Sequence, residues 1–287
     1  MFYINHIIVC YGGRLDYYHG AKYQILRLVS KFFDPSRNTI TVLTDRPDLF
    51  EHYPVNILEL TNSQKLQWSL NGLQHFGIKL KGFEYAMMNV DSEISIISDT
   101  DMYWIKNPIL AANKVKESGA IMMYQNEGTI YGTRNRSIQR FEEGLKGKVF
   151  HVNEESYRLS RTSEMWASNI IALPTQKSYL INDAYHLFSQ LEPFVDAHTV
   201  EQFAVSETLR LRGIPKISGK RLLGSWSSTG RKLHVAAQLK EFFTEHGENE
   251  FDDHFSNWKS IKIKRPFATL IDQKFKKTCD RLAKKLF

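Results

Sequence analysis

The stretch ISIISDTDMYWIKNP, residues 94–108, joins a short apolar run to two acidic residues, and it decides how the chain is interpreted. Its first part is rich in isoleucine and typical of a buried strand. Asp99 and Asp101 follow directly, and residues two apart in an extended backbone point to the same side. We therefore expect both carboxylates to face one site, with Thr100 turned to the other side.

Two carboxylates at this distance repel each other, and burial of either one is costly. A hard divalent cation removes the conflict, because Mg²⁺ and Mn²⁺ bind through one or two carboxylates and complete their shells with water and substrate phosphates. The alternative is that Asp99 is a turn or cap residue and Asp101 a solvated surface acid. The apolar strand before the pair and the aromatic residues after it favour a metal site.

Strand-like and helix-like segments alternate through the first hundred residues. Short apolar runs typical of buried strands occupy residues 6–11, 39–45, 55–60 and 93–98. Segments with a helical pattern lie between them, at residues 20–33, 63–80 and 82–89. This alternation predicts the α/β class, with a mostly parallel sheet covered by helices on both faces.

The second half of the chain is less regular. We predict strands at residues 120–125 and 168–174, and amphipathic helices at residues 175–191 and 200–213. Residues 126–164 are polar and basic with little periodicity, and a long insertion of this kind is usually functional or mobile. No internal repeat or linker divides the chain, so we expect one domain over residues 1–245 and a C-terminal extension over residues 246–287.

The 287 residues carry a formal net charge of +7, which favours an anionic partner. Much of the excess lies near the C-terminus rather than in a patch over the body, so we expect no nucleic-acid partner. Cys10 and Cys279 match no metal-ligand spacing and fit a reducing compartment. The N-terminus has no signal-peptide pattern. These features predict a cytoplasmic protein without a disulfide.

Other functions that use an acidic pair fit less well. A calcium loop needs a third acid and a glycine in register, and neither is present. A nucleotidyl or phosphoryl transferase would also use a metal-bound nucleotide, but the sequence has neither a P-loop nor a glycine-rich nucleotidyltransferase signature. That enzyme class stays as an alternative, and so does a basic nucleic-acid-binding protein.

Residues 96–108 resemble the D-x-D segment of glycosyltransferases with the GT-A fold, in the nucleotide-diphospho-sugar transferase superfamily. In that family a strand of the form hhhhDxDhhhhxxP delivers the metal site for a sugar nucleotide. Residues 6–25, 41–45, 165–174 and 199–209 are similar, in order, to further family segments. The resemblance covers roughly residues 5–240. It implies a Rossmann-like sheet, with a nucleotide-binding part over about residues 1–108 and an acceptor part over about residues 109–245.

The resemblance also implies roles around a metal ion. Asp101 would be a direct ligand, and Asp99 would bind the metal through a coordinating water or contact the ribose. Such sites often take a histidine from a C-terminal loop as third ligand, and His234 is the candidate, with His254 as a competitor. The neighbouring cations Arg231 and Lys232 could meet the phosphates instead.

Three residues after the first predicted strand are candidates for nucleotide binding. Tyr11 either stacks on a pyrimidine base or packs at the mouth of the loop, and Gly12 and Gly13 allow close approach of the backbone. Asp45, at the end of the second predicted strand, either contacts the nucleotide or caps the helix that Pro47 begins.

Catalytic candidates lie in the later segments. In inverting relatives an acid at the position of Glu201 is the general base that deprotonates the acceptor hydroxyl. Here the motif is Val-Glu-Gln where the commonest form ends in Glu-Asp, so a retaining mechanism stays open. Asp196 is a second possible base. Asn169 either hydrogen-bonds sugar hydroxyls or the acceptor, or is a strand-edge amide.

The pattern of the C-terminal segment predicts a basic amphipathic helix. Apolar residues from Phe267 to Leu286 fall at helical spacing among lysines, and Phe255 and Trp258 precede them. Such a helix can lie on an anionic membrane surface, as in glycosyltransferases that resemble this arrangement, or it can pack on the domain.

The sequence therefore predicts a metal-dependent glycosyltransferase of the hexosyltransferase type, with Mn²⁺ or Mg²⁺ as cofactor. The donor would be a nucleoside-diphosphate sugar, with UDP favoured and GDP as the second choice. The acceptor would be a glycan or a lipid-linked hydroxyl in the synthesis of lipopolysaccharide or capsule. The protein would lie in the cytoplasm or bind peripherally to the inner face of the cell membrane.

Overall fold

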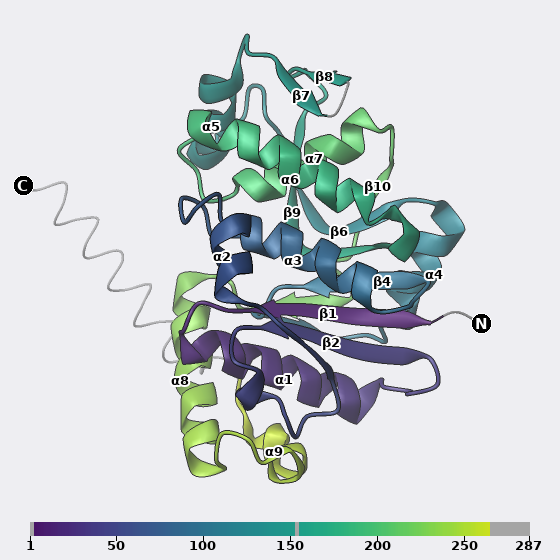
Figure 1. Cartoon of the computed structure of the whole chain (residues 1–287), viewed down its shortest axis with the longest axis vertical. Coiled ribbons are helices and arrows are strands. Elements are labelled where there is room, and N and C mark those ends of the chain that lie inside the picture. The colour runs from purple at the N-terminus through teal and green to yellow at the C-terminus, as the bar shows by residue number, and fades with distance from the viewer. Residues whose placement is uncertain (1–2, 153–154, 265–287) are drawn as a thin grey trace, which may run out of the picture.

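A seven-stranded sheet forms the centre of the computed structural model, which describes residues 3–152 and 155–264 (Figure 1). The strand order is β10-β6-β9-β4-β1-β2-β3. Neighbouring strands pair in parallel except around β9, which runs antiparallel to β4 and β6. The strands are β1 (Ile4–Cys10), β2 (Asn38–Thr44), β3 (Asn56–Glu59), β4 (Ile94–Ser98), β6 (Ile121–Thr129), β9 (Glu164–Pro174) and β10 (Lys216–Ser218).

Helices cover both faces of this sheet. In β1, Ile7 and Val9 join the core with α3 (Phe76–Asn89), α6 (Tyr179–Leu191) and α7 (Val200–Leu211). Ile4 and Ile8 point the other way and pack with α1 (Leu15–Lys31), α4 (Ile109–Ser118) and α8 (Thr229–Glu245). Side chains alternate between the two cores as expected of a fully buried strand. The prediction of an α/β fold with a mostly parallel central sheet flanked by helices is confirmed.

The predicted irregular insertion, residues 126–164, contains more structure than expected. It includes α5 (Arg136–Leu145) and the two-stranded sheet of β7 (Phe150–Val152) and β8 (Glu155–Tyr157). Ile138, Phe141 and Leu145 bury one stripe of α5 at spacings of three and four residues. The expectation of little periodicity was therefore wrong, because polar residues on the other faces of α5 hide this stripe.

Asp99 and Asp101 lie in a turn rather than on a strand. β4 ends at Ser98, and the N–H of Met102 donates to the Asp99 carbonyl at 3.2 Å, before the short strand β5 (Met102–Trp104) pairs with β11 (Leu223–Ser225). The expected alternation of an extended backbone is therefore wrong here. A Cβ atom on Gly20 would collide with the Thr100 carbonyl, so α1 packs directly against this turn and holds it in place.

The chain after β11 returns to α1. α8 and α9 (Phe251–Asn257) lie beside α1 in Figure 1. Trp258 is buried, within 6.2 Å of the Tyr23 ring and 6.0 Å of the Arg27 guanidinium, so it is not free to anchor a membrane interface. The predicted basic helix lies in residues 265–287, outside the described part. In the described ranges, no helix is long and apolar enough to cross a membrane.

The remaining elements are short. α2 (Asn62–Trp68) is preceded by the N-cap residue Thr61, which forms a capping box with Gln64. Single 3₁₀ turns occupy Pro47–Leu49, Thr175–Lys177, Glu192–Phe194 and Trp258–Ser260.

Candidate active site

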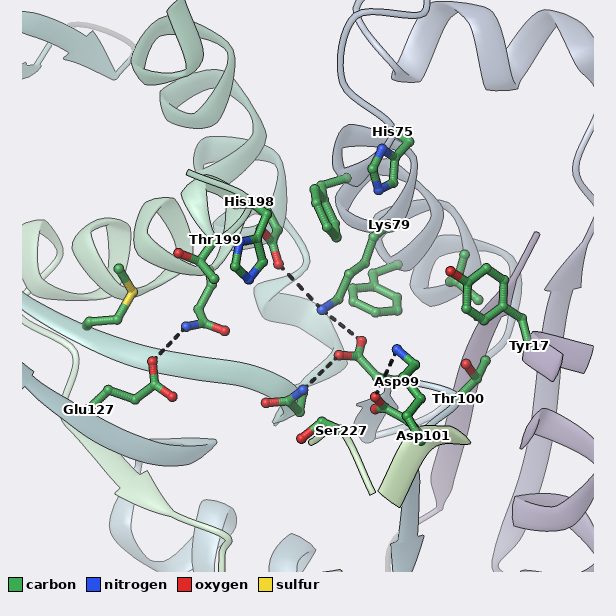
Figure 2. Close-up of a pocket in the computed structure, with 18 of the residues that line it drawn as sticks. Tyr17, His75, Lys79, Asp99, Thr100, Asp101, Glu127, His198, Thr199 and Ser227 are labelled. Carbon is green, nitrogen blue, oxygen red and sulfur yellow. Dashed lines mark hydrogen bonds and ion pairs between the residues drawn. The ribbon is translucent and has the colours of Figure 1, made fainter. Parts of the chain in front are cut away.

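A cavity of about 530 Å³ opens at the carboxyl ends of β1 and β4 (Figure 2). Its walls come from the residues that follow those strands, from β9, and from helices α3 and α7. β1 lies at the point where the strand order reverses, with β2 on one side and β4 on the other. Ligands of open α/β sheets bind at this kind of switch point.

Asp99 lines the cavity with both of its carboxylate oxygens engaged. Oδ1 lies 2.7 Å from the Lys79 ammonium, and Oδ2 accepts a hydrogen bond from Asn169 Nδ2 at 3.1 Å. The backbone N–H of Asp99 also donates to the Asn169 carbonyl at 2.9 Å. Asn169 therefore positions Asp99, and it lines the cavity as well.

Asp101 and Thr100 line the same cavity, although Thr100 was expected to turn away. Asp101 Oδ2 lies 3.5 Å from the ammonium of Lys232. Its other oxygen, Oδ1, is buried and has no hydrogen-bond partner. An unpaired buried carboxylate oxygen is costly, so this atom is a point where a ligand could bind.

Lys79 and Glu201 complete the charged centre. Lys79, on α3, also lies 3.7 Å from Glu201 Oε1 and 3.3 Å from the Ser168 hydroxyl. Glu201 sits in the first turn of α7 with 4% of its surface exposed, and its Oε2 is a second buried oxygen without a partner. Two acids that line one cavity thus each keep a buried oxygen without a partner.

Burial and charge act against each other on these groups. Burial raises the pKa of Glu201, with Lys79 opposing and Asp99 adding to the rise. Burial and the charge of Asp99 raise the pKa of Asp101, while Lys232 and Lys79 oppose them. Burial alone would lower the pKa of Lys79, but Asp99 and Glu201 outweigh it and raise that pKa, so Lys79 is a permanent cation.

The loop after β1 meets the cavity through Tyr11. The Tyr11 hydroxyl donates to the His75 carbonyl at 2.7 Å, and burial raises the pKa of that phenol well above its usual range. Gly12 and Gly13 have φ angles of 101° and 76°, which only glycine adopts without strain. A Cβ atom on either residue would meet nothing within 4 Å, so the turn, not a close protein contact, requires glycine.

Asp45 fastens this loop instead of lining the cavity. Its carboxylate accepts from the Tyr18 hydroxyl at 2.6 Å and from Lys65 at 2.9 Å, and the N–H of Gly12 lies 3.4 Å away. It does not cap the 3₁₀ turn at Pro47, since the residue in the cap position is Arg46. The predicted capping role of Asp45 is therefore wrong, and its carboxylate holds α1, α2 and the first loop together.

Of the cations near β11, only one reaches the acidic pair. Lys232 lines the cavity, whereas Arg231 donates to the Ser225 carbonyl at 3.4 Å. His234 is also directed elsewhere, because its Nε2 lies 3.0 Å from the Lys262 carbonyl. His254 is buried between the Tyr53 hydroxyl and the Gly247 carbonyl. The structure brings neither histidine to Asp101, which corrects their assignment as third metal ligand.

The structure also places Asp196, the second candidate base, away from the cavity. It is fully exposed, contacts Arg140, and lies outside the cavity in the loop before α7. Of the two candidate bases, Glu201 alone lines the cavity. The far wall carries Gln202, whose amide donates to Glu127 at 3.1 Å, and His198 (Figure 2).

Sequence reasoning missed Lys79, the residue that binds Asp99 most closely. A signal was present, because Phe76, Lys79 and Phe83 follow one another at helical spacing on the buried face of α3. A lysine in such a stripe must pair with an acid or reach solvent. Glu127 and His198 gave no comparable signal, since the far end of β6 brings Glu127 to the cavity and the loop before α7 brings His198.

The described residues contain no group of three or more histidine, cysteine or acidic side chains that could hold a metal ion. The donor set nevertheless fits one divalent cation of the Mg²⁺ type, which needs only one or two carboxylates when substrate phosphates supply further oxygens. The unpartnered Oδ1 of Asp101 is the ligand available for it.

No family model and no curated protein matches the sequence. Among solved structures, the chain is similar to mouse xyloside xylosyltransferase 1 in its apo form, at 12% identity. The superposition covers 75% of this chain and 84% of that chain, with a TM-score of 0.44. A likeness at this level carries no argument about activity, so function has to be argued from the cavity itself.

Proposed function

We propose that this protein is a glycosyltransferase that moves a sugar from a nucleoside-diphosphate donor to an acceptor hydroxyl. The observation that carries the proposal is the cavity at the strand switch point, where Asp101 and Glu201 each present a buried oxygen without a partner. One orphaned carboxylate fits a cation on a diphosphate, and the other fits a hydroxyl that must lose a proton.

The two sides of the cavity suggest how the substrates would lie. Tyr11 and Tyr17 border the β1 side, where a nucleotide base could stack, and Lys232 lies near Asp101, where a diphosphate would meet positive charge. Glu127, Gln202 and His198 border the other side and could hydrogen-bond sugar hydroxyls. We propose UDP-sugars as first-choice donors and GDP-sugars as the second choice.

Mn²⁺ or Mg²⁺ is proposed as cofactor, held by Asp101. Such an ion, when bound, would neutralise the charge that grows on the leaving diphosphate. Asn169 and Lys79 would keep the Asp99 carboxylate in place. Glu201 would accept the acceptor proton in an inverting reaction, and its raised pKa suits a group that takes up a proton.

For the acceptor, we propose a hydroxyl of a glycan or a lipid-linked molecule in surface-polysaccharide synthesis. The transfer would take place in the cytoplasm or at the inner face of the cell membrane. The support is the basic C-terminal sequence, which would favour an anionic surface. Binding to vesicles that contain anionic lipid, lost on deletion of residues 265–287, is the expected outcome.

The decisive experiment incubates the protein with a panel of nucleotide sugars and Mn²⁺ and measures nucleotide release and thermal stabilisation. We expect one donor to raise the melting temperature and to be turned over, and Asp101→Asn to slow the turnover by about 10²–10³-fold. Absence of binding by every donor, or equal turnover by the variant, would refute the proposal. Release of pyrophosphate or transfer of a nucleotidyl group would identify the rival enzyme class.

A further inference from the structure

The cavity already holds a cation of its own. The ammonium of Lys79 reaches Asp99 from α3, as Figure 2 shows, and lies 2.7 Å from Oδ1. Glu201 and Ser168 surround it further, at 3.7 Å and 3.3 Å. Only 8% of Lys79 is exposed, so water cannot replace these partners. The ammonium is therefore part of the built structure and not a mobile surface charge.

Each carboxylate oxygen of Asp99 already has a partner in this arrangement. Lys79 occupies Oδ1 and Asn169 occupies Oδ2, while the backbone on either side is held by β9 and the turn. An approaching divalent ion would have to displace an ammonium at close range, and the two positive charges would repel each other at that carboxylate.

Asp101 differs in each of these respects. Its Oδ1 is unpartnered, and its nearest cation, Lys232, is 42% exposed and lies 3.5 Å from Oδ2. A side chain of that exposure can move toward solvent or toward an anionic ligand. One carboxylate with water is a weak site for Mg²⁺ or Mn²⁺, and phosphate oxygens are the usual remaining ligands.

We propose that Lys79 takes the place of a metal at Asp99, so that a divalent ion binds through Asp101 alone and only together with a diphosphate ligand. The requirement for the diphosphate rests on the proposed function, whereas the occupation of Asp99 does not. Lys79 is thus a positioning residue that makes metal loading conditional on the donor. Without it, Asp99 Oδ1 would lose its ammonium partner and become available to an ion beside the neighbouring Asp101.

The test measures Mn²⁺ binding directly, by electron paramagnetic resonance of free Mn²⁺, without any nucleotide. Lys79→Met keeps the length of the side chain and removes its charge. We expect this variant to bind Mn²⁺ at least about tenfold more tightly than the wild type. We also expect Mn²⁺ to raise the melting temperature of the variant more than that of the wild type. Equal affinity of the two proteins would overturn the proposal.

Two further variants show whether the gained site is the expected one. Lys79→Met combined with Asp99→Asn should lose the gained affinity, and retention of that affinity would contradict the role of Asp99. Lys81→Met is the matched control, because Lys81 lies on the same helix, pairs with Glu84 and does not line the cavity. It should bind Mn²⁺ like the wild type, and a gain equal to that of Lys79→Met would also overturn the proposal.

A wild-type experiment keeps the proposal testable if Lys79→Met does not fold. Here the expected result is weak Mn²⁺ binding that tightens at least about tenfold when UDP is added as a diphosphate probe. Saturable binding of Mn²⁺ alone, as tight as with UDP, would refute conditional loading. If no nucleotide binds, the proposed function fails, while the comparison of Mn²⁺ affinities without nucleotide still decides whether Lys79 blocks Asp99.

Discussion

Among the described residues, two lysines are buried beside acids, and the two clusters differ in which polar atoms lack a partner. Lys22 on α1 has no exposed surface and contacts the carbonyl and carboxylate of Glu248, with the rings of Phe50, Tyr53 and Phe243 within 6 Å. His19 shares the same carboxylate at 3.1 Å. This cluster is closed, and it ties the segment after α8 to α1.

The cluster around Lys79 is open to a cavity. Its carboxylates outnumber its ammonium groups, and Asp101 and Glu201 each keep an oxygen without a partner. A buried charge therefore does not by itself mark a functional site, since both clusters contain one. The difference is that Asp101 and Glu201 line a cavity and each keeps an oxygen without a partner.

Substitution of each lysine by methionine should separate the clusters most strongly. Lys79→Met leaves Asp99 and Glu201 buried without a counter-ion, so we expect the free energy of unfolding to fall by about 3–5 kcal/mol at neutral pH. Lys22→Met leaves Glu248 without its lysine partner, but solvent reaches that carboxylate. The free energy of unfolding should therefore change by less than about 1 kcal/mol. Urea unfolding of both variants measures this. Equal losses of unfolding free energy in the two variants would contradict the distinction between the open and the closed cluster.

Loss of one cavity carboxylate should affect turnover rather than folding. Asp101→Asn removes the proposed ligand for the cation, and we expect nucleotide release to slow by about 10²–10³-fold. Stability should hold, because burial and the charge of Asp99 already disfavour the ionised form of Asp101. Asp91→Asn is the control, an exposed acid in the loop before β4. A turnover rate for Asp101→Asn that matches this control would place the chemistry elsewhere.

The two clusters should also respond to acid in opposite directions. Burial lowers the pKa of His19, so only the unfolded chain takes up this proton at first, and stability is lost as the pH falls below 6.5. Burial raises the pKa of Glu201, so its ionisation costs stability at neutral pH, and that cost is relieved as the pH falls through the raised pKa.

Urea unfolding at pH 7 and pH 5 tests this pair. His19→Gln should reduce the loss of stability in acid, and Glu201→Gln should raise stability at pH 7 relative to the wild type. If Glu201→Gln destabilises the protein at pH 7, the Glu201 carboxylate is a net stabilising partner of Lys79. The statement that its ionisation costs stability would then be wrong.

The smallest effect is expected at the rim. Asp196→Asn changes an exposed acid that contacts Arg140 outside the cavity, so turnover should stay within about twofold of the wild type. Glu201→Gln, by contrast, should lower turnover by about 10²-fold or more if Glu201 is the base. A large loss for Asp196→Asn with little loss for Glu201→Gln would exchange the two roles.

Much of the fold could be predicted because it depends on local patterns. The apolar runs before Gly12, Asp45 and Asp99 became β1, β2 and β4, and the helical stripes between them became α1 and α3. The insertion was the main error, since α5 buries a narrow stripe among charged residues. The position of the two acids after a buried strand was predicted correctly, but their backbone conformation was not. They lie in a turn that α1 and β9 hold.

The sequence by itself determined the α/β class and placed Asp99 and Asp101 after a buried strand, because strand and helix periodicity are properties of neighbouring residues. Only the tertiary structure decided what those acids meet. It brought Lys79 from α3, Asn169 from β9, Glu201 from α7 and Lys232 from α8 to one cavity, and it sent Asp45, Asp196 and His234 elsewhere. The physical reason is that charges pair across space wherever packing buries them, and no sequence spacing records that distance.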